Sequence, residues 1–216
     1  MIYTDFIPRI LWLLAGLMVM GGCSSAYYAT MEKFGKEKRH LLKDNVEDVK
    51  ASQTKAQEEF KDALTRIKEL TAFEGGDLEL FYNKLKNSYE DCDSRASQIE
   101  HRINKVETVA QDLFSEWEGE VRQIKDTGLK NASRKSLADA KIRYKNLELA
   151  MAQSTKGMYP VLEKLKDYVL YLKHNLNAKA VGALGGEVVS IEKDVAGLVR
   201  DMNRSIREAD QFISSF

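Results

Sequence analysis

Apolar residues recur along the first third of the chain at alternating spacings of four and three residues. This first seam consists of Leu42, Val46, Val49, Ala56, Phe60, Ala63, Ile67 and Leu70, with Gln53 as its polar member. So narrow a stripe is typical of a coiled coil, because the apolar face of an ordinary globular helix is broader. The pattern predicts a long helix that begins after a cap at Thr30 and ends at the Gly-containing turn of residues 74–77.

Two further seams with helical spacing follow. The second consists of Leu85, Tyr89, Cys92, Ala96, Ile99, Ile103, Val106, Ala110, Leu113, Trp117, Val121 and Ile124. Residues 126–128 interrupt the pattern, and we expect Asn131 or Ser133 to cap a third helix. The third seam consists of Leu137, Tyr144, Leu147, Met151, Met158, Leu162, Leu165, Tyr168, Leu172 and Leu176. Gly157 and Pro160 lie within it and predict a hinge, seen as a kink or short break, because proline removes a backbone donor and crowds the preceding turn.

A Gly-rich turn at residues 182–186 precedes a last, shorter pattern. Its apolar positions are Val188, Ile191, Val195, Leu198, Met202, Ala209 and Phe212, and Val199, Ile206 and Ile213 widen the face. Turns of a few residues make sequential helices antiparallel. We therefore expect an all-α domain over residues 30–216: an elongated, antiparallel, coiled-coil-like bundle of three long helices plus a shorter C-terminal helix.

The composition agrees with long helices, since 31% of residues are charged and only 2 of 216 are proline. Basic and acidic residues number 33 each, so no net field directs the chain to nucleic acid, and we expect no such partner. The charge is unevenly placed. Residues 126–180 contain 11 basic and 5 acidic residues, whereas residues 77–125 contain 7 basic and 11 acidic residues. We expect attraction between these neighbours to explain the basic third helix, with docking to an anionic envelope polymer as the alternative.

Residues 1–22 have the pattern of a secretory leader. Their apolar run, residues 10–20, is about half the roughly 20 residues that a membrane-spanning helix needs, so a cleaved signal is favoured over a permanent span. Met20–Cys23 resembles the lipobox of bacterial lipoproteins, in which small residues precede a lipidated cysteine. The resemblance implies cleavage between Gly22 and Cys23 and a covalent lipid on Cys23. A short uncleaved anchor and a plain secretory signal are the alternatives.

The residues after the cysteine bear on the destination of the chain. In such lipoproteins an Asp at this position tends to retain the protein at the inner membrane, and Ser24 stands there instead. The resemblance therefore implies the periplasmic face of a bacterial outer membrane, with residues 23–29 as a lipidated tether. Tyr27 and Tyr28 are candidates for contact at headgroup depth, and Lys33 and Lys36 for attraction to lipid phosphates. An ordinary helix start is the alternative for these four residues.

The stretch Gly-Cys-Ser-Ser-Ala-Tyr-Tyr at residues 22–28 is followed by Met-Glu-Lys-Phe-Gly at residues 31–35 and then by the long helices. This succession resembles a proteobacterial envelope lipoprotein family known only as a domain of unknown function. The resemblance covers essentially the whole mature chain. It implies no activity, ligand or partner.

No pattern in the chain points to catalysis. Cys92 lies on the second seam beside three acidic residues, and burial and negative charge both disfavour its thiolate. With Cys23 lipidated, Cys92 has no partner for an intramolecular disulfide. His40, His101 and His174 fall on three different helices, none with a second metal ligand one turn away. We expect no metal and no cofactor beyond the covalent lipid.

The leading hypothesis is a non-enzymatic, membrane-anchored envelope lipoprotein that acts as a helical interaction scaffold for an unidentified protein partner. An alternative is a periplasmic carrier or chaperone-like protein that binds an apolar ligand or client between its helices. Its groove would be lined by Met151, Met158, Tyr168 and Tyr171 and opened by the break at Gly157. Membrane remodelling by the short apolar segment 180–186 is a third hypothesis, and an enzyme is the least favoured.

Overall fold

The structure is a computed structural model, and it describes residues 38–71, 77–177, 181–182 and 184–215. The chain divides into two units, residues 1–41 and residues 42–216. The fold described is that of the second unit. The predicted cap at Thr30 lies outside the described residues.

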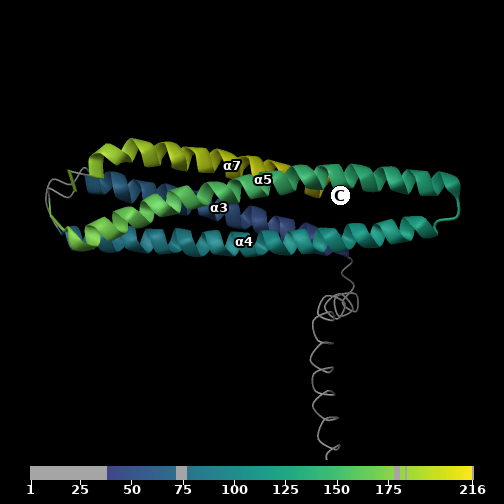
Figure 1. Cartoon of the computed structure of the whole chain (residues 1–216), viewed down its shortest axis with the longest axis horizontal. Coiled ribbons are helices and arrows are strands. Elements are labelled where there is room, and N and C mark those ends of the chain that lie inside the picture. The colour runs from purple at the N-terminus through teal and green to yellow at the C-terminus, as the bar shows by residue number, and fades with distance from the viewer. Residues whose placement is uncertain (1–37, 72–76, 178–180, 183, 216) are drawn as a thin grey trace, which may run out of the picture. The chain divides into compact units, whose positions relative to one another are not determined.

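Four long helices make up the fold. They are α3 (Lys38–Thr71), α4 (Leu78–Gln123), α5 (Thr127–His174) and α7 (Val188–Ser214), and the short 3-10 helix η1 (Gly185–Glu187) precedes α7. The described residues contain no strand. Figure 1 shows the long helices lying side by side. The predicted all-α bundle of three long helices and a shorter C-terminal helix is confirmed.

Helices α3 and α7 run antiparallel in one constant register. Three polar contacts join them: Lys50 to Asp210, Gln57 to Asn203, and Lys68 to Glu192. From one contact to the next, the residue number on α3 rises by seven and then by eleven. The residue number on α7 falls by the same amounts. Steps of this length return to the same face of a helix, so one face of α3 follows one face of α7 throughout.

The sequential helices are antiparallel as well. Glu118 pairs with Lys141 and Glu100 with Tyr159, so eighteen residues along α4 match eighteen along α5. Helices α3 and α4 are joined by Glu59 with Arg95 and Asp48 with Arg102, and α5 meets α7 through Lys164 and Asp194. Rising numbers on one helix meet falling numbers on the next, which is the antiparallel order that the short turns predict.

The cap of the third helix differs from the prediction. Asp126 is the N-cap of α5, with an extended backbone (φ −66°, ψ 124°), and its carboxylate accepts a hydrogen bond of 2.8 Å from the Leu129 N–H. The prediction of Asn131 or Ser133 was wrong, because Gly128 is accommodated in the first turn and does not end the helix. The hydroxyl of Ser133 instead accepts a hydrogen bond of 3.0 Å from the Trp117 ring N–H.

The predicted seams form the core, with a shift near the end of α4. Every residue of the first seam is buried, Gln53 included. On α4, Leu113 and Trp117 are half-buried, whereas Phe114 is buried and packs edge-on against Tyr144 with ring centroids 5.5 Å apart. A straight helix drifts relative to a strict seven-residue repeat, so the core face moves by one residue over this length. Four other seam positions depart from prediction: Tyr89, Ile124 and Val188 are half-buried, and Leu176 is exposed beyond α5.

The hinge predicted at Gly157 and Pro160 is absent, because α5 is one continuous helix through both residues. Pro160 is exposed, and so is Lys156, whose carbonyl loses its helical partner and can bond to water instead. Gly157 faces α7, where an added Cβ would lie 3.4 Å from Leu198 Cδ1 and 3.7 Å from an Asp201 oxygen. The glycine therefore permits a close approach of two helices and does not act as a pivot.

A layer of polar side chains interrupts the apolar core. The Gln53 amide donates a 2.8 Å hydrogen bond to Ser154 Oγ, which donates to the Met151 carbonyl at 2.8 Å. One turn along α3, the Gln57 amide donates to the Asn203 side chain at 3.1 Å. The carbonyl oxygen of Gln53 and the hydroxyl of Ser205 are buried and have no hydrogen-bond partner among the described residues. Because buried polar groups cost free energy unless they are paired, this layer favours one alignment of the helices over others.

We expect substitutions of Gly157 to separate close packing from flexibility. Gly157→Ala should leave the free energy of unfolding unchanged or raise it by up to about 1 kcal/mol, because its Cβ just fits and alanine favours the helix. Gly157→Leu should lower it by about 1–3 kcal/mol through overpacking against Leu198. Urea unfolding followed by circular dichroism measures both. Equal and large losses for the two variants would contradict the packing role.

A double-mutant cycle tests the polar layer. Ser154→Ala should lower the free energy of unfolding by about 1–3 kcal/mol, because it leaves the buried Gln53 amide without its acceptor. Gln53→Leu combined with Ser154→Ala removes both polar groups and should recover most of that loss. Ser52→Ala is the matched control, since the Ser52 hydroxyl bonds only to the Asp48 carbonyl of its own helix. Additive losses in the double variant would show that the pair does not interact.

Candidate functional site

The predicted lipidation and interface residues lie outside the described residues. They are Gly22, Cys23, Ser24, Tyr27, Tyr28, Lys33 and Lys36. The structure therefore does not place them, and their roles stay predictions. Within the part of the chain that the structure describes, no helix is long and apolar enough to cross a membrane.

The groove predicted for an apolar ligand is not formed. Met151 and Met158 are fully buried in the core. Tyr168 is also buried, and its hydroxyl donates a 3.3 Å hydrogen bond to the Leu184 carbonyl. This hydrogen bond joins α5 to the turn before α7. Tyr171 is exposed. Three of the four predicted lining residues thus fill the core of the bundle.

A hollow of about 720 Å³ lies between α3 and α4. All of its lining residues carry polar or charged groups: Asn45, Asp48, Ser94, Ser97, Gln98, His101, Arg102 and Lys105. An ion pair of 2.9 Å between Arg102 and Asp48 joins the two helices here. The hollow is therefore a polar surface groove, whose charges are in part already neutralised by each other.

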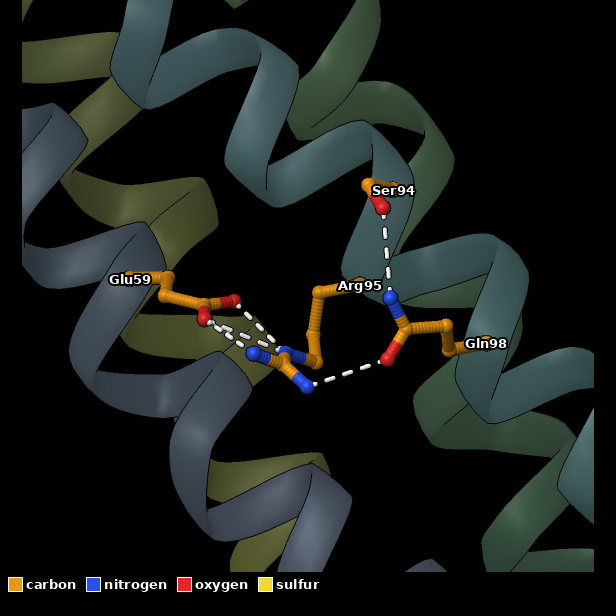
Figure 2. A network of polar contacts seen from close by, with 4 residues as sticks. All are labelled: Glu59, Ser94, Arg95 and Gln98. Carbon is orange, nitrogen blue, oxygen red and sulfur yellow. Dashed lines mark hydrogen bonds and ion pairs between the residues drawn. The ribbon is translucent and has the colours of Figure 1, made fainter.

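A connected set of polar contacts borders this groove (Figure 2). The Arg95 guanidinium reaches from α4 to both carboxylate oxygens of Glu59 on α3, at 2.7–3.1 Å. A third nitrogen of Arg95 donates to Gln98 at 3.1 Å, and Gln98 donates to Ser94 at 3.2 Å. The Glu59 hydrogen bonds raise the pKa of Arg95 further. A forked guanidinium–carboxylate pair of this kind fixes the spacing of two helices.

The groove holds a serine and a histidine one turn apart, without the geometry of an activated nucleophile. Ser97 donates its hydroxyl proton to the Asp93 carbonyl at 3.1 Å and so does not direct it toward His101. His101 itself is exposed. Nucleophilic catalysis requires the hydroxyl and its base to be in hydrogen-bond contact. Across the described residues, no group of three or more metal-ligating side chains is found.

Cys92 lies in the core of α4 and is fully buried. Burial is the main cause that raises the pKa of its thiol, followed by the charges of Glu59, Asp91 and Asp62, from a usual value of 9.0 to about 12. The sequence indicated burial and the acidic neighbours on the same helix. It did not indicate Glu59 and Asp62, because these belong to α3 and come close only through the packing of the two helices.

We expect the buried Cys92 to resist alkylation in the folded protein. At pH 8 a pKa of about 12 lowers the thiolate fraction about a thousandfold relative to a thiol at 9.0. Treatment with iodoacetamide, followed by mass spectrometry of the peptide that contains Cys92, should show modification only after unfolding in urea. Alkylation of the folded chain at the rate of the unfolded chain would show that this thiol is accessible.

Comparison with known proteins gives a family but no activity. No curated protein and no solved structure matches the chain. One family model, described as "Protein of unknown function (DUF2959)", matches residues 27–216, a range that contains all four long helices. The match begins four residues after Cys23, so it covers the bundle and not the leader. The chain therefore belongs to the DUF2959 family of proteins of unknown function.

Proposed function

We propose that this protein is a non-enzymatic, membrane-anchored lipoprotein of the bacterial cell envelope, whose helical bundle is an interaction scaffold. The observation that carries the proposal is the position of the lipobox-like sequence Met20–Cys23, directly before the family domain that starts at residue 27. A lipidated Cys23 would leave only a short tether before the helical domain. The bundle would then be presented next to the membrane.

The described helices support a scaffold in preference to an enzyme or carrier. Their core is filled by the seam residues, and Met151 and Met158 lie inside it and line no groove. The groove between α3 and α4 is polar, and its serine hydroxyls bond within α4. What these helices offer is a long external surface, which is the means by which a scaffold acts.

The destination follows from the same sequence features. Ser24, in place of an aspartate, favours export to the periplasmic face of the outer membrane. Tyr27 and Tyr28, with Lys33 and Lys36, would contact the headgroup region beside the anchor. The covalent lipid on Cys23 is the only prosthetic group in this proposal, and its protein partner is unidentified.

Replacement of Cys23 tests the anchor. Cys23→Ala should release the protein from membranes or leave an unprocessed precursor, because no other side chain in the leader can accept the lipid. Cys92→Ala is the matched control, since it removes the chain's other cysteine and should leave a mature, membrane-bound protein. Fractionation and immunoblotting of cells that produce each variant measure the outcome. A Cys23→Ala protein found in membranes at mature size would refute the proposal.

A further inference from the structure

The hairpin of α4 and α5 extends past the end of α7. Phe212, near the last residue of α7, packs against Tyr144 with ring centroids 6.0 Å apart. The α5 residues before Tyr144 and the α4 residues opposite them therefore continue beyond α7 as a helix pair (Figure 1). We call residues 121–135, which contain the turn between the two helices, the hairpin tip.

The hairpin tip carries a concentration of unpaired positive charge. Its five basic side chains are Arg122, Lys125, Lys130, Arg134 and Lys135. None of the five has an ion-pair partner among the described residues, whereas Lys141, Lys145 and Lys164 farther along α5 do. Asp126 is the acidic residue of the tip, and one of its oxygens caps α5.

An apolar side chain stands among these cations. Leu129, in the first turn of α5, is 66% exposed. Next to it along the chain is Lys130, and Lys125 lies in the turn before it. An exposed leucine with lysines on either side of it along the chain has the composition of a surface that enters the boundary between lipid headgroups and acyl chains.

A shallow hollow of about 300 Å³ lies beside the tip, between α4 and α5. Val121 and Leu137 contribute apolar surface to it, Arg122 and Arg134 contribute two guanidinium groups, and Glu118 contributes a carboxylate. Lys141 also lines the hollow and is paired with Glu118. The Lys141 hydrogen bond and charge, with a smaller effect of Arg122, hold the pKa of that carboxyl below its usual range. Two neighbouring guanidinium groups can donate hydrogen bonds to the oxygens of one phosphate group. The hollow therefore suits a phosphate attached to an apolar chain.

We propose that the hairpin tip binds the phosphate headgroups of anionic phospholipids at a membrane surface. Leu129 enters the edge of the acyl region, while Arg122 and Arg134 bind a headgroup phosphate. The exposed leucine and the apolar wall of the hollow favour lipid over an anionic polymer, which offers charge without acyl chains. A second copy of the chain is disfavoured because two tips of the same charge repel each other. This contact does not depend on the N-terminal anchor.

Photocrosslinking tests the contact on the full chain. Leu129→benzoylphenylalanine is reconstituted in vesicles of phosphatidylcholine, either alone or mixed with phosphatidylglycerol, with the lipids radiolabelled. Ser97→benzoylphenylalanine places the same group on an exposed position of α4 away from the tip, as a control. We expect crosslinks to lipid at residue 129 in the mixed vesicles, at several times the yield of residue 97, and a clear decrease in phosphatidylcholine alone. Vesicle flotation measures attachment through the N-terminal segment separately.

Removal of the tip arginines is a second test of the proposal. Each basic residue near an anionic surface contributes about fivefold to partitioning, so Arg122→Gln with Arg134→Gln should lower the crosslinking yield by up to about 25-fold. Arg200→Gln with Arg204→Gln removes two exposed arginines of α7, away from the tip, and should leave the yield unchanged. Circular dichroism checks that each variant folds, and raised salt on the parent chain repeats the test without mutation. The proposal would be overturned by equal crosslinking yields in both vesicle types, or by a yield that does not respond to the tip arginines and to salt. Crosslinks to protein in place of lipid would also overturn it.

Discussion

The buried amide of Gln53 is the constraint on which the arrangement of the helices depends. Its seam is otherwise a repeat of apolar residues, and a repeat can be satisfied equally well after a slip of seven residues. A slip would separate Ser154 from Gln53 and Asn203 from Gln57, and the fully buried Gln53 amide left unpaired would cost about 1–3 kcal/mol. The polar layer thus selects one register for α3 against both α5 and α7. That register also determines where α7 ends along α5, and so which part of the α4–α5 hairpin α7 leaves uncovered.

The periodicity of the sequence was sufficient to predict the architecture. The first seam contains every core residue of α3 between Leu42 and Leu70 except the flanking Ser52 and Gln57. The errors arose where tertiary context overrides a local signal. Pro160 alone predicts a break in the helix. On the exposed face, however, water can replace the hydrogen bond that this proline removes. Gly157 alone predicts flexibility, although its role is to let α7 approach α5 closely.

The candidate sites were less predictable, because they depend on contacts between helices. The Glu59–Arg95 pair and the acidic neighbours of Cys92 on α3 follow from the alignment of α3 with α4, which no single-helix pattern specifies. The basic character of the third helix was evident in the sequence and was interpreted as attraction to the second. Glu118 with Lys141 fits that interpretation. The cations of the hairpin tip do not, and their lack of ion pairs is visible only once the helices are in register.

We propose a helical bundle that is held at a membrane through its own N-terminus and acts through its surface. The intact mass of the protein, purified from the membranes of the cells that make it, tests this most directly. We expect a chain that begins at Cys23 and carries covalent acyl groups, with every later residue unmodified. A chain that retains the leader, or one that begins at another residue without acyl groups, would contradict it.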